Sequence, residues 1–437
     1  MSPVQYRPAG GTASEIAADV ERAVREGVLA GGELLPTVRS LAADLQVAPG
    51  TVAAAYRSLR ERGLVQSDGR RGTRVRPRPT VAARVQATPP LPPGAVDLST
   101  GLPDPALLPR LPRLAARMAG SPAEPVLPRL AELGRARLER DGVPAGALTV
   151  TSGALDAIER VLGAHLRPGD AVAVEDPGWP SLLDLVAGLG LRAVPVALDG
   201  DGPLPESLAA ALRAGARAVV LTSRAQNPTG AAVPPGRRDL LRAVLAPGTL
   251  VVEDDHAGDL GDVPLAAVCG TTTAWAFVRS LSKPYGPDLR VALVAGDPTT
   301  IGRVEGRLRL GPGWVSWLLQ ELAAALLADP AVDAVIAEAA RLYAVRRTQL
   351  LAGLQARGVG ASGRTGLNVW VPVADETAAV TRLLADGWLV APGSRFRLAS
   401  PPGVRISLGA LDATDLPRLA TAVAAATTGG RRPAYSA

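Results

Sequence analysis

The chain has 437 residues, enough for two or three domains, and 47% of them are apolar, as expected of a protein with a large core. With one cysteine (Cys269) and two histidines (His165 and His256), an internal disulfide framework is excluded, and we expect no metal centre. No apolar run approaches the roughly 18 residues of a membrane span, so we expect no membrane segment. Residues 1–10 hold no apolar core of a signal peptide, so we expect no secretory signal.

Residues 14–75 predict three helices followed by a β-hairpin. Ser14 is a good N-cap for the first helix and Thr37 for the second, and Pro49 suits the first turn of the third. Asp68-Gly69 predicts the turn between short strands at 64–66 and 73–75. Two helices joined by a tight turn and followed by a hairpin are typical of a winged helix-turn-helix, a DNA-binding fold.

The third helix and the hairpin are strongly basic. Between Arg57 and Arg78, eight arginines stand against Glu61 and Asp68, and this net +6 equals the charge of the whole chain. Such a surface is typical of contact with DNA phosphates, although a solvated charged face is the alternative.

The segment LPTVRSLAADL at 35–45, with Thr51-Val52, Tyr56 and Gly72-Thr73, resembles the GntR-type winged-helix domain. The resemblance implies that residues 1–75 bind double-stranded DNA. The contacts we expect come from Arg39, Thr51, Arg57, Arg70 and Arg71. GntR-type domains often have Ser-Arg before the third helix, where this chain has Ala48-Pro49. Phosphate contacts are therefore expected to dominate over base readout.

A Pro-rich segment at 76–93 predicts an extended linker, and the pattern then changes. Short β-branched runs, such as 171–174, 218–222 and 274–279, alternate with helical segments such as 155–166 and 205–214. This alternation predicts an α/β domain with a mostly parallel sheet at 94–296. A long helix at 332–356, strands at 368–372 and 403–408, and a last helix near 412–425 predict a smaller α+β subdomain at 297–437.

Chemically suitable residues follow several of the predicted strands. Gly153 and Ala154 open a helix that can hold a phosphate, and Trp179 offers a flat apolar face. Asn227 begins the turn Asn-Pro-Thr-Gly, and Asp254 ends another strand. Ser280 and Lys283 follow the next strand, and Arg290 comes seven residues later. Because ligands of open α/β sheets lie at the carboxyl ends of strands, these residues are expected to share one ligand.

Lys283 is the only lysine beside 46 arginines. An arginine replaces a plain positive charge but forms no Schiff base, so this amine is predicted to have a chemical role. Taken singly, Lys283 could be a surface charge and Asn-Pro-Thr-Gly a simple turn. Together the motifs predict a ligand with a phosphate, a flat ring, a ring nitrogen and an aldehyde. Pyridoxal 5′-phosphate meets all four requirements.

The order and spacing of these motifs, from about Asp97 to about Ala425, resemble the fold-type I aminotransferases. The resemblance implies that Lys283 forms the internal aldimine and Asp254 pairs with the pyridinium nitrogen. It also implies that Asn227 bonds the phenolic oxygen and that Trp179 stacks on the ring. Phosphate contacts would come from Gly153, Ala154, Ser280 and Arg290. Arg405 matches the arginine that binds a substrate carboxylate.

Two positions depart from the aminotransferase pattern. His256 stands where the family usually has a tyrosine that touches the ring oxygen, so we include it among the cofactor contacts. The family's early tyrosine is not evident near Gly120-Ser121-Pro122. These departures make efficient transamination less expected than cofactor binding.

A GntR-type module joined to an aminotransferase-like domain resembles the MocR family of regulators. The resemblance implies a cytoplasmic homodimer that binds DNA and senses pyridoxal phosphate, or an amino compound, through an aldimine at Lys283. One alternative is an active aminotransferase acting on an amino acid. Another is a DNA-binding protein whose large domain serves only for dimerisation.

Overall fold

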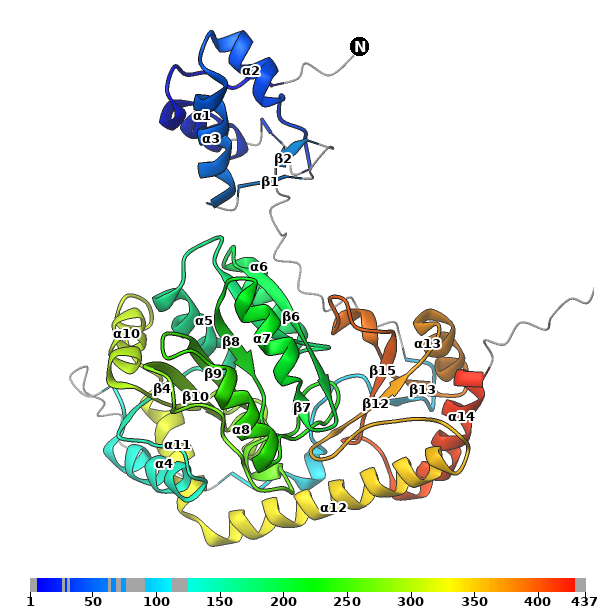
Figure 1. The fold of residues 1–437 in the computed structure, drawn as a ribbon. Coiled ribbons are helices and arrows are strands. Elements are labelled where there is room, and N and C mark those ends of the chain that lie inside the picture. Colours follow the sequence, from blue (N-terminus) through cyan, green and yellow to red (C-terminus); the bar gives the residue numbers. More distant parts are fainter. Residues whose placement is uncertain are drawn as a thin grey trace, which may run out of the picture. The chain divides into compact units, whose positions relative to one another are not determined.

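The computed structural model describes residues 6–25, 28–29, 32–61, 64–67, 72–75, 91–111 and 125–428. The N-terminal module contains α1 (Ala13–Arg25), α2 (Val38–Leu45) and α3 (Pro49–Glu61), followed by β1 (Val65–Ser67) and β2 (Thr73–Val75) (Figure 1). The two strands are antiparallel. Ile16, Leu41, Val52, Tyr56 and Leu59 are buried in its core. The predicted winged helix-turn-helix is confirmed. Its predicted turn at Asp68-Gly69 and the predicted contacts Arg70 and Arg71 lie outside the described residues.

Polar contacts fix the ends of these helices. Thr37 is the N-cap of α2, and its hydroxyl accepts a hydrogen bond from Ser40 N at 3.2 Å. The Tyr56 hydroxyl donates to Pro36 O at 2.9 Å and so joins α3 to the start of α2. Residues 33–35 run alongside β2, where Val75 N donates to Glu33 O and Leu35 N to Thr73 O, both at 2.8 Å. No sequence signal predicted this third extended segment.

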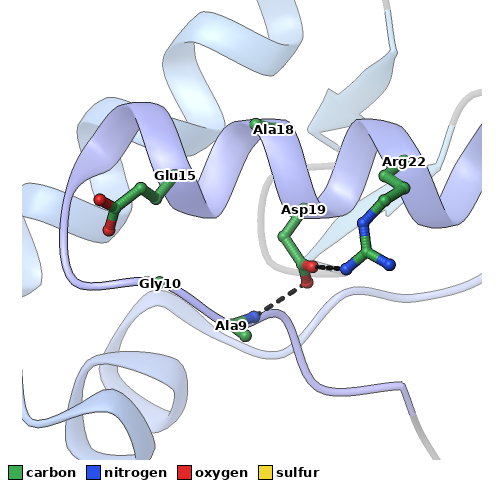
Figure 2. Close-up of a pocket in the computed structure, with 6 residues that line it drawn as sticks. All are labelled: Ala9, Gly10, Glu15, Ala18, Asp19 and Arg22. Carbon is green, nitrogen blue, oxygen red and sulfur yellow. Dashed lines mark hydrogen bonds and ion pairs between the residues drawn. The ribbon is translucent and has the colours of Figure 1, made fainter.

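A shallow pocket lies between α1 and the residues that precede it (Figure 2). Asp19 accepts hydrogen bonds from Ala9 N and from the Tyr6 hydroxyl, and it also pairs with Arg22. Glu15 accepts from the amides of Gly11 and Thr12 at the start of α1. Both carboxylates are therefore engaged in holding the N-terminal arm to the helix.

The large domain is built on an eight-stranded sheet in the order β4-β11-β10-β9-β8-β5-β6-β7. The strands are β4 (Ala147–Thr151), β5 (Ala171–Asp176), β6 (Arg192–Asp199), β7 (Gly202–Pro203), β8 (Ala216–Leu221), β9 (Leu250–Asp255), β10 (Ala274–Ser280) and β11 (Ala292–Gly296). Strands β8, β9 and β10 are parallel, whereas β11 is antiparallel to both β10 and β4. The α/β fold with a mostly parallel sheet is confirmed.

Helices alternate with these strands (Figure 1). They are α4 (Pro128–Arg140), α5 (Ala154–His165), α6 (Pro180–Gly188), α7 (Pro205–Arg213), α8 (Pro235–Val244), the short α9 (Ser282–Tyr285), α10 (Pro298–Arg309) and α11 (Trp317–Ala328). Short 3₁₀ turns are present at Pro105–Leu107 and Gly258–Leu260. Strand β5 is buried along its whole length, as expected of a strand that is covered on both faces.

The C-terminal part contains α12 (Pro330–Gln355), β12 (Asn368–Pro372), α13 (Glu376–Ala385), β13 (Trp388–Leu389), β14 (Ala391–Pro392), β15 (Gly403–Ser407) and α14 (Leu416–Thr428). A short 3₁₀ turn at Gly393–Arg395 follows β14, and another at Ala413–Asp415 precedes α14. Strands β12, β15 and β14 form an antiparallel sheet. The long helix α12 reaches from α11 to β12 and α14 and so connects the two parts (Figure 1).

One strand pairing brings the start of the large domain to the C-terminal part. Strand β3 (Val96–Asp97) is parallel to β13, with Val96 opposite Trp388. The polypeptide that follows the predicted linker therefore lies beside the C-terminal elements. The predicted linker and domain boundaries stay predictions, and residues 76–90 lie outside the described part. Among the residues that the structure describes, no helix is both long enough and apolar enough to span a bilayer.

Candidate functional site

A cavity of about 540 Å³ opens where several strands of the large sheet end. Strand β10 leads to Lys283, β9 to His256, and β8 to the turn that begins at Asn227. Eight of the predicted site residues line this cavity, namely Ala154, Trp179, Asn227, His256, Ser280, Lys283, Arg290 and Arg405. Residues predicted from scattered motifs therefore surround one space, at the edge where α/β sheets bind ligands.

Lys283 lies in the short helix α9, directly after β10. Its Nζ donates a hydrogen bond to Gly101 O at 2.5 Å. Burial, together with the nearby Arg405 charge, lowers the pKa of this amine from its ordinary 10.5 to about 8. A larger share of the amine is therefore unprotonated near neutral pH than in an exposed lysine, as a nucleophile requires.

Asp254 is buried near the end of β9 and is not a lining residue of the cavity. Its Oδ1 has no hydrogen-bond partner among the described residues, and its Oδ2 lies 3.8 Å from His256 Nδ1. Burial raises the pKa of this carboxyl well above its ordinary value, and Asp255 and Glu175 add repulsion. A buried acceptor without a partner fits a ligand that brings a cationic N–H to this point.

His256 lines the cavity at the position predicted for a ring contact. Burial lowers the pKa of its imidazole to about 4, and the positive charges of Lys283 and Arg405 act in the same direction. The ring is therefore neutral at neutral pH. It can donate one hydrogen bond and accept another, which a tyrosine hydroxyl also does.

Asn227 and Arg405, predicted for two different ligand groups, are joined to each other. Arg405 Nη1 donates to Asn227 Oδ1 at 2.9 Å, and Nη2 donates to Ser99 O at 2.5 Å. The guanidinium also lies 4.8 Å from the centre of the Phe396 ring, but its Nε has no partner among the described residues. Burial lowers the pKa of Arg405 to about 9, with help from the Arg395 charge.

Side-chain hydrogen bonds of Gln226 hold the turn that begins at Asn227. The amide nitrogen of Gln226 donates to Glu175 and to Pro177 O, while its amide oxygen accepts from the amide and the hydroxyl of Thr229. Burial raises the pKa of Glu175 to about 7. These contacts orient the turn so that Asn227 faces the cavity.

The predicted phosphate site lies at the start of α5. Gly153 has φ +99°, which favours glycine, and an added Cβ would lie 2.6 Å from Arg290 Nη2. Arg290, itself at φ +47°, is exposed and donates to Ser152 O at 3.1 Å. The guanidinium is thus held beside the N-terminus of a helix, and both features favour an anion.

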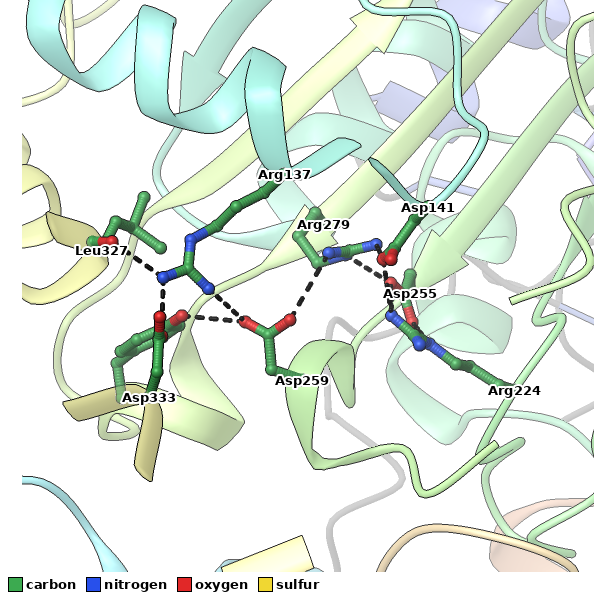
Figure 3. Close-up of polar contacts among 9 residues, drawn as sticks. Arg137, Asp141, Arg224, Asp255, Asp259, Arg279, Leu327 and Asp333 are labelled. Carbon is green, nitrogen blue, oxygen red and sulfur yellow. Dashed lines mark hydrogen bonds and ion pairs between the residues drawn. The ribbon is translucent and has the colours of Figure 1, made fainter. Parts of the chain in front are cut away.

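Asp255, the neighbour of Asp254, belongs to an ion-pair network that runs from the buried β9 toward the surface at Asp333 (Figure 3). Successive side chains of a strand point to opposite faces, so the two acids of β9 have different surroundings. Asp255 pairs with Arg224 and Arg279, and these cations hold its pKa far below the ordinary value. The network continues through Asp141, Asp259, Arg137 and Asp333. It is a structural support next to the cavity.

Among the lining residues that were not predicted are two short segments. Residues 99–102 contribute Ser99 O and Gly101 O, which accept from Arg405 and Lys283. In the sequence, this segment is marked only by the glycine at position 101, which has φ +65° in the structure. Arg395 and Phe396, which follow β14, also line the cavity. No periodicity marks them, because they lie in a short turn.

The predicted DNA contacts that the structure describes lie on the second and third helices of the N-terminal module. Arg39 on α2 and Arg57 on α3 are exposed, and Thr51 is half-buried near the start of α3. Arg74, one of the eight arginines of the basic segment, donates to Gly32 O at 3.0 Å. Its guanidinium therefore supports the fold of the module.

Two families match the chain. Residues 12–75 match the bacterial regulatory proteins of the gntR family, and residues 129–423 match aminotransferase class I and II. Among curated proteins, the vitamin B6 salvage pathway transcriptional repressor PtsJ of Salmonella typhimurium is 42% identical over 94% of this chain and 97% of its own length. The pyridoxine biosynthesis regulator PdxR of Corynebacterium glutamicum is 29% identical over 77% of each chain.

Solved structures share the fold of about three quarters of the chain. The kynurenine aminotransferase of Pyrococcus horikoshii has a TM-score of 0.69 and 23% identity, and the match covers 76% of this chain and 91% of that enzyme. A mutant aspartate aminotransferase of Thermus thermophilus has a TM-score of 0.65 and 26% identity, over 78% and 98%. The chain therefore belongs to the MocR-type transcriptional regulators, in which a GntR-family helix-turn-helix is joined to an aminotransferase class I and II domain.

Proposed function

We propose that this regulator binds pyridoxal 5′-phosphate in the 540 Å³ cavity and that occupancy of the cavity changes its affinity for DNA. The observation that carries the proposal is the position of Lys283. The only primary amine among the side chains of the sequence lies in the same cavity as Asn227, Arg290 and Arg405. When bound, the cofactor would supply an aldehyde that reacts with amines and a ring that withdraws electrons.

Each predicted residue has a task toward that ligand. Lys283 would attach to the aldehyde carbon, and Asp254 would accept a hydrogen bond from the ring nitrogen and keep it protonated. Trp179 would cover one face of the ring. Asn227 and His256 would bond the ring oxygen, and Gly153, Ala154, Ser280 and Arg290 would hold the phosphate. Asp254 Oδ1 supports this assignment, because none of the described residues donates a hydrogen bond to it.

The signal would be pyridoxal phosphate itself, or an amino compound that displaces Lys283 from it and places its carboxylate on Arg405. The names of two relatives, a vitamin B6 salvage repressor and a pyridoxine biosynthesis regulator, support a signal linked to this vitamin. We propose that the protein acts in the cytoplasm as a homodimer. In each subunit Arg39, Thr51, Arg57, Arg70 and Arg71 would contact DNA.

Reduction with borohydride tests the attachment. Protein incubated with pyridoxal phosphate, reduced, digested and mapped should carry a pyridoxyl group on the peptide that contains Lys283. Lys283→Ala protein is the control and should yield an unlabelled map. An unlabelled Lys283 peptide from wild-type protein would remove the basis of the proposal.

A working aminotransferase is the second candidate, and Arg405 favours it because it matches an arginine that binds a substrate carboxylate. Multiple-turnover assays with amino acid and keto acid pairs separate the two functions. Turnover of about 1 per second or faster would identify an enzyme. A regulator would show saturable ligand binding with far slower turnover.

A further inference from the structure

The cavity has more positive charge than the proposed cofactor and one carboxylate would use. Four cationic side chains line it: Lys283, Arg290, Arg395 and Arg405. No carboxylate is among the lining residues in the described part of the chain. Lys283, Arg290 and Arg405 have assigned partners in the proposed function, namely the aldehyde, the phosphate and an α-carboxylate. Arg395 has none.

Arg395 also lacks a hydrogen-bond or ion-pair partner among the residues that the structure describes. Its Nε is buried and forms no hydrogen bond to any residue that the structure describes. By contrast, Arg397, two residues later, is paired with Glu376, with 2.7 Å between Nε and Oε1. A partly buried guanidinium without an anion is costly, and the cost is removed when an anionic ligand pairs with it.

The backbone that carries Arg395 is held on both sides. Ser394 N donates to Glu376 at 2.7 Å, and Phe396 O accepts from Gly178 N at 2.7 Å. Beyond Phe396, Asp176 accepts from the amides of residues 398, 399 and 400. Because the turn is well anchored, its side chain is held in a fixed position that suits ligand binding.

We propose that Arg395 binds a second anionic group, so that the cavity selects amino compounds with an acidic side chain, either a carboxylate or a phosphate. Arg405 would take the α-carboxylate and Arg395 the distal anion. A guanidinium forms charge-assisted hydrogen bonds with either group. This inference rests on the proposed function, since it assumes an amino compound that reacts at the bound cofactor.

Titrations with matched amino acids test the proposal on the full-length, cofactor-loaded protein. The ligands are L-glutamate with L-glutamine, L-aspartate with L-asparagine, and O-phospho-L-serine with L-serine, followed through the visible absorption of the cofactor. We expect at least one acidic ligand to bind about tenfold or more tightly than its neutral partner, which corresponds to one buried charge pair. The pair with the largest ratio identifies the distal group as carboxylate or phosphate.

The variant Arg395→Gln should reduce that ratio to about one while binding of the neutral ligand persists. Arg382→Gln removes an exposed guanidinium on α13 and is the matched control, which should keep the wild-type ratio. Equal binding of acidic and neutral partners to wild-type protein would overturn the proposal. So would an unchanged ratio in Arg395→Gln.

A second measurement does not depend on the cofactor. Cofactor-free protein is heated with the dianion glutarate or with the monoanion butyrate. Glutarate should raise the Tm of wild-type protein more than butyrate does. In Arg395→Gln, the two anions should raise Tm equally. Equal Tm shifts with the two anions in wild-type protein would count against the inference. A protein that forms no cofactor band fails the proposed function, and the Tm comparison then still decides the role of Arg395. A protein that forms the band yet prefers no acidic ligand fails only this inference.

Discussion

At the scale of single residues, burial sets the charge of several basic side chains that line the cavity. Lys283, His256 and Arg405 all have lowered pKa values, because burial penalises their charged forms and each lies near another cation. An anionic ligand would relieve this repulsion. The same surroundings keep part of the Lys283 amine unprotonated near neutral pH.

The rate at which Lys283 combines with pyridoxal phosphate should follow the unprotonated amine. We expect it to rise with pH to a plateau with a midpoint near pH 8, well below the ordinary 10.5. Removing a nearby positive charge raises an amine's pKa, so Arg405→Gln should move the midpoint to higher pH. Stopped-flow absorbance from pH 6 to 10 measures both curves. A wild-type midpoint near 10 would contradict this prediction.

Asp254→Asn should change cofactor affinity and protein stability in opposite directions. The folded-state pKa of Asp254 is raised, so its ionised form costs stability as pH rises above its ordinary 3.8. Cofactor-free Asp254→Asn should therefore equal wild type near pH 4 and gain about 1 kcal/mol at pH 8, as expected when a poorly paired buried charge is removed. Its affinity for pyridoxal phosphate should fall about tenfold or more. Urea unfolding and absorbance titration measure the two effects.

Replacing Asp255, the neighbour of Asp254, should have the opposite effect on stability. Cations lower the folded-state pKa of Asp255, so its contribution to stability is present above pH 3.8 and is lost only in stronger acid. Asp255→Asn should therefore destabilise the protein at pH 8 by about 3 kcal/mol, the usual cost of breaking a buried ion pair. Equal effects of the two substitutions would contradict the different surroundings of these residues.

At the scale of elements, Asp176 connects the end of β5 to the loop that follows Arg395. Three backbone amides and the Ser400 hydroxyl donate to its two carboxylate oxygens at 2.7–2.8 Å. One side chain from a strand of the large sheet thus accepts four of the hydrogen bonds that hold this loop. This contact holds the turn of residues 393–396 against the cavity.

Asp176→Ala should cost about 2–4 kcal/mol, because several amides lose their acceptor at once. It should also weaken ligand binding, since the turn that carries Arg395 loses one of its anchors. Asp239→Ala removes an exposed carboxylate on α8 and should change stability by less than about 0.5 kcal/mol. Denaturant unfolding of the three proteins checks this, and equal losses would disprove the anchoring role.

On the N-terminal module, Arg57→Gln should weaken DNA binding similarly for all sequences. Loss of one phosphate contact should reduce the slope of log affinity against log salt concentration by about one. The exposed Arg309 on α10 provides a matched control, because Arg309→Gln should leave both affinity and slope unchanged. Fluorescence anisotropy at several salt concentrations measures the slope, and an unchanged slope in Arg57→Gln would exclude this contact.

Local sequence signals predicted the long elements and the position of the cavity. The run at 274–279 became β10 at Ala274–Ser280, and Pro49 begins α3 as expected. Two-residue strands such as β3 and β13 escaped prediction, because they depend on pairing between distant segments. Arg395 and the hydrogen bond between Arg405 and Asn227 also escaped, since no periodicity encodes which turns meet in space.

At the scale of the whole molecule, two modules of known families share one chain, so ligand and DNA can be coupled. A ligand changes DNA affinity only if it binds differently to the DNA-bound and free forms, and such coupling typically amounts to about 1–3 kcal/mol. The coupling is reciprocal, so DNA should change the affinity for the ligand by the same factor. The cavity chemistry at Lys283 is the proposed origin of the difference.

The most direct test is a DNA-binding titration on the region upstream of the protein's own gene, with and without pyridoxal phosphate. The wild-type Kd should change by about fivefold or more when the cofactor is bound, in line with typical coupling energies. Lys283→Ala protein should show one Kd under both conditions. A wild-type Kd that stays constant after the cofactor band has formed, or an equal change in Lys283→Ala, would contradict the account.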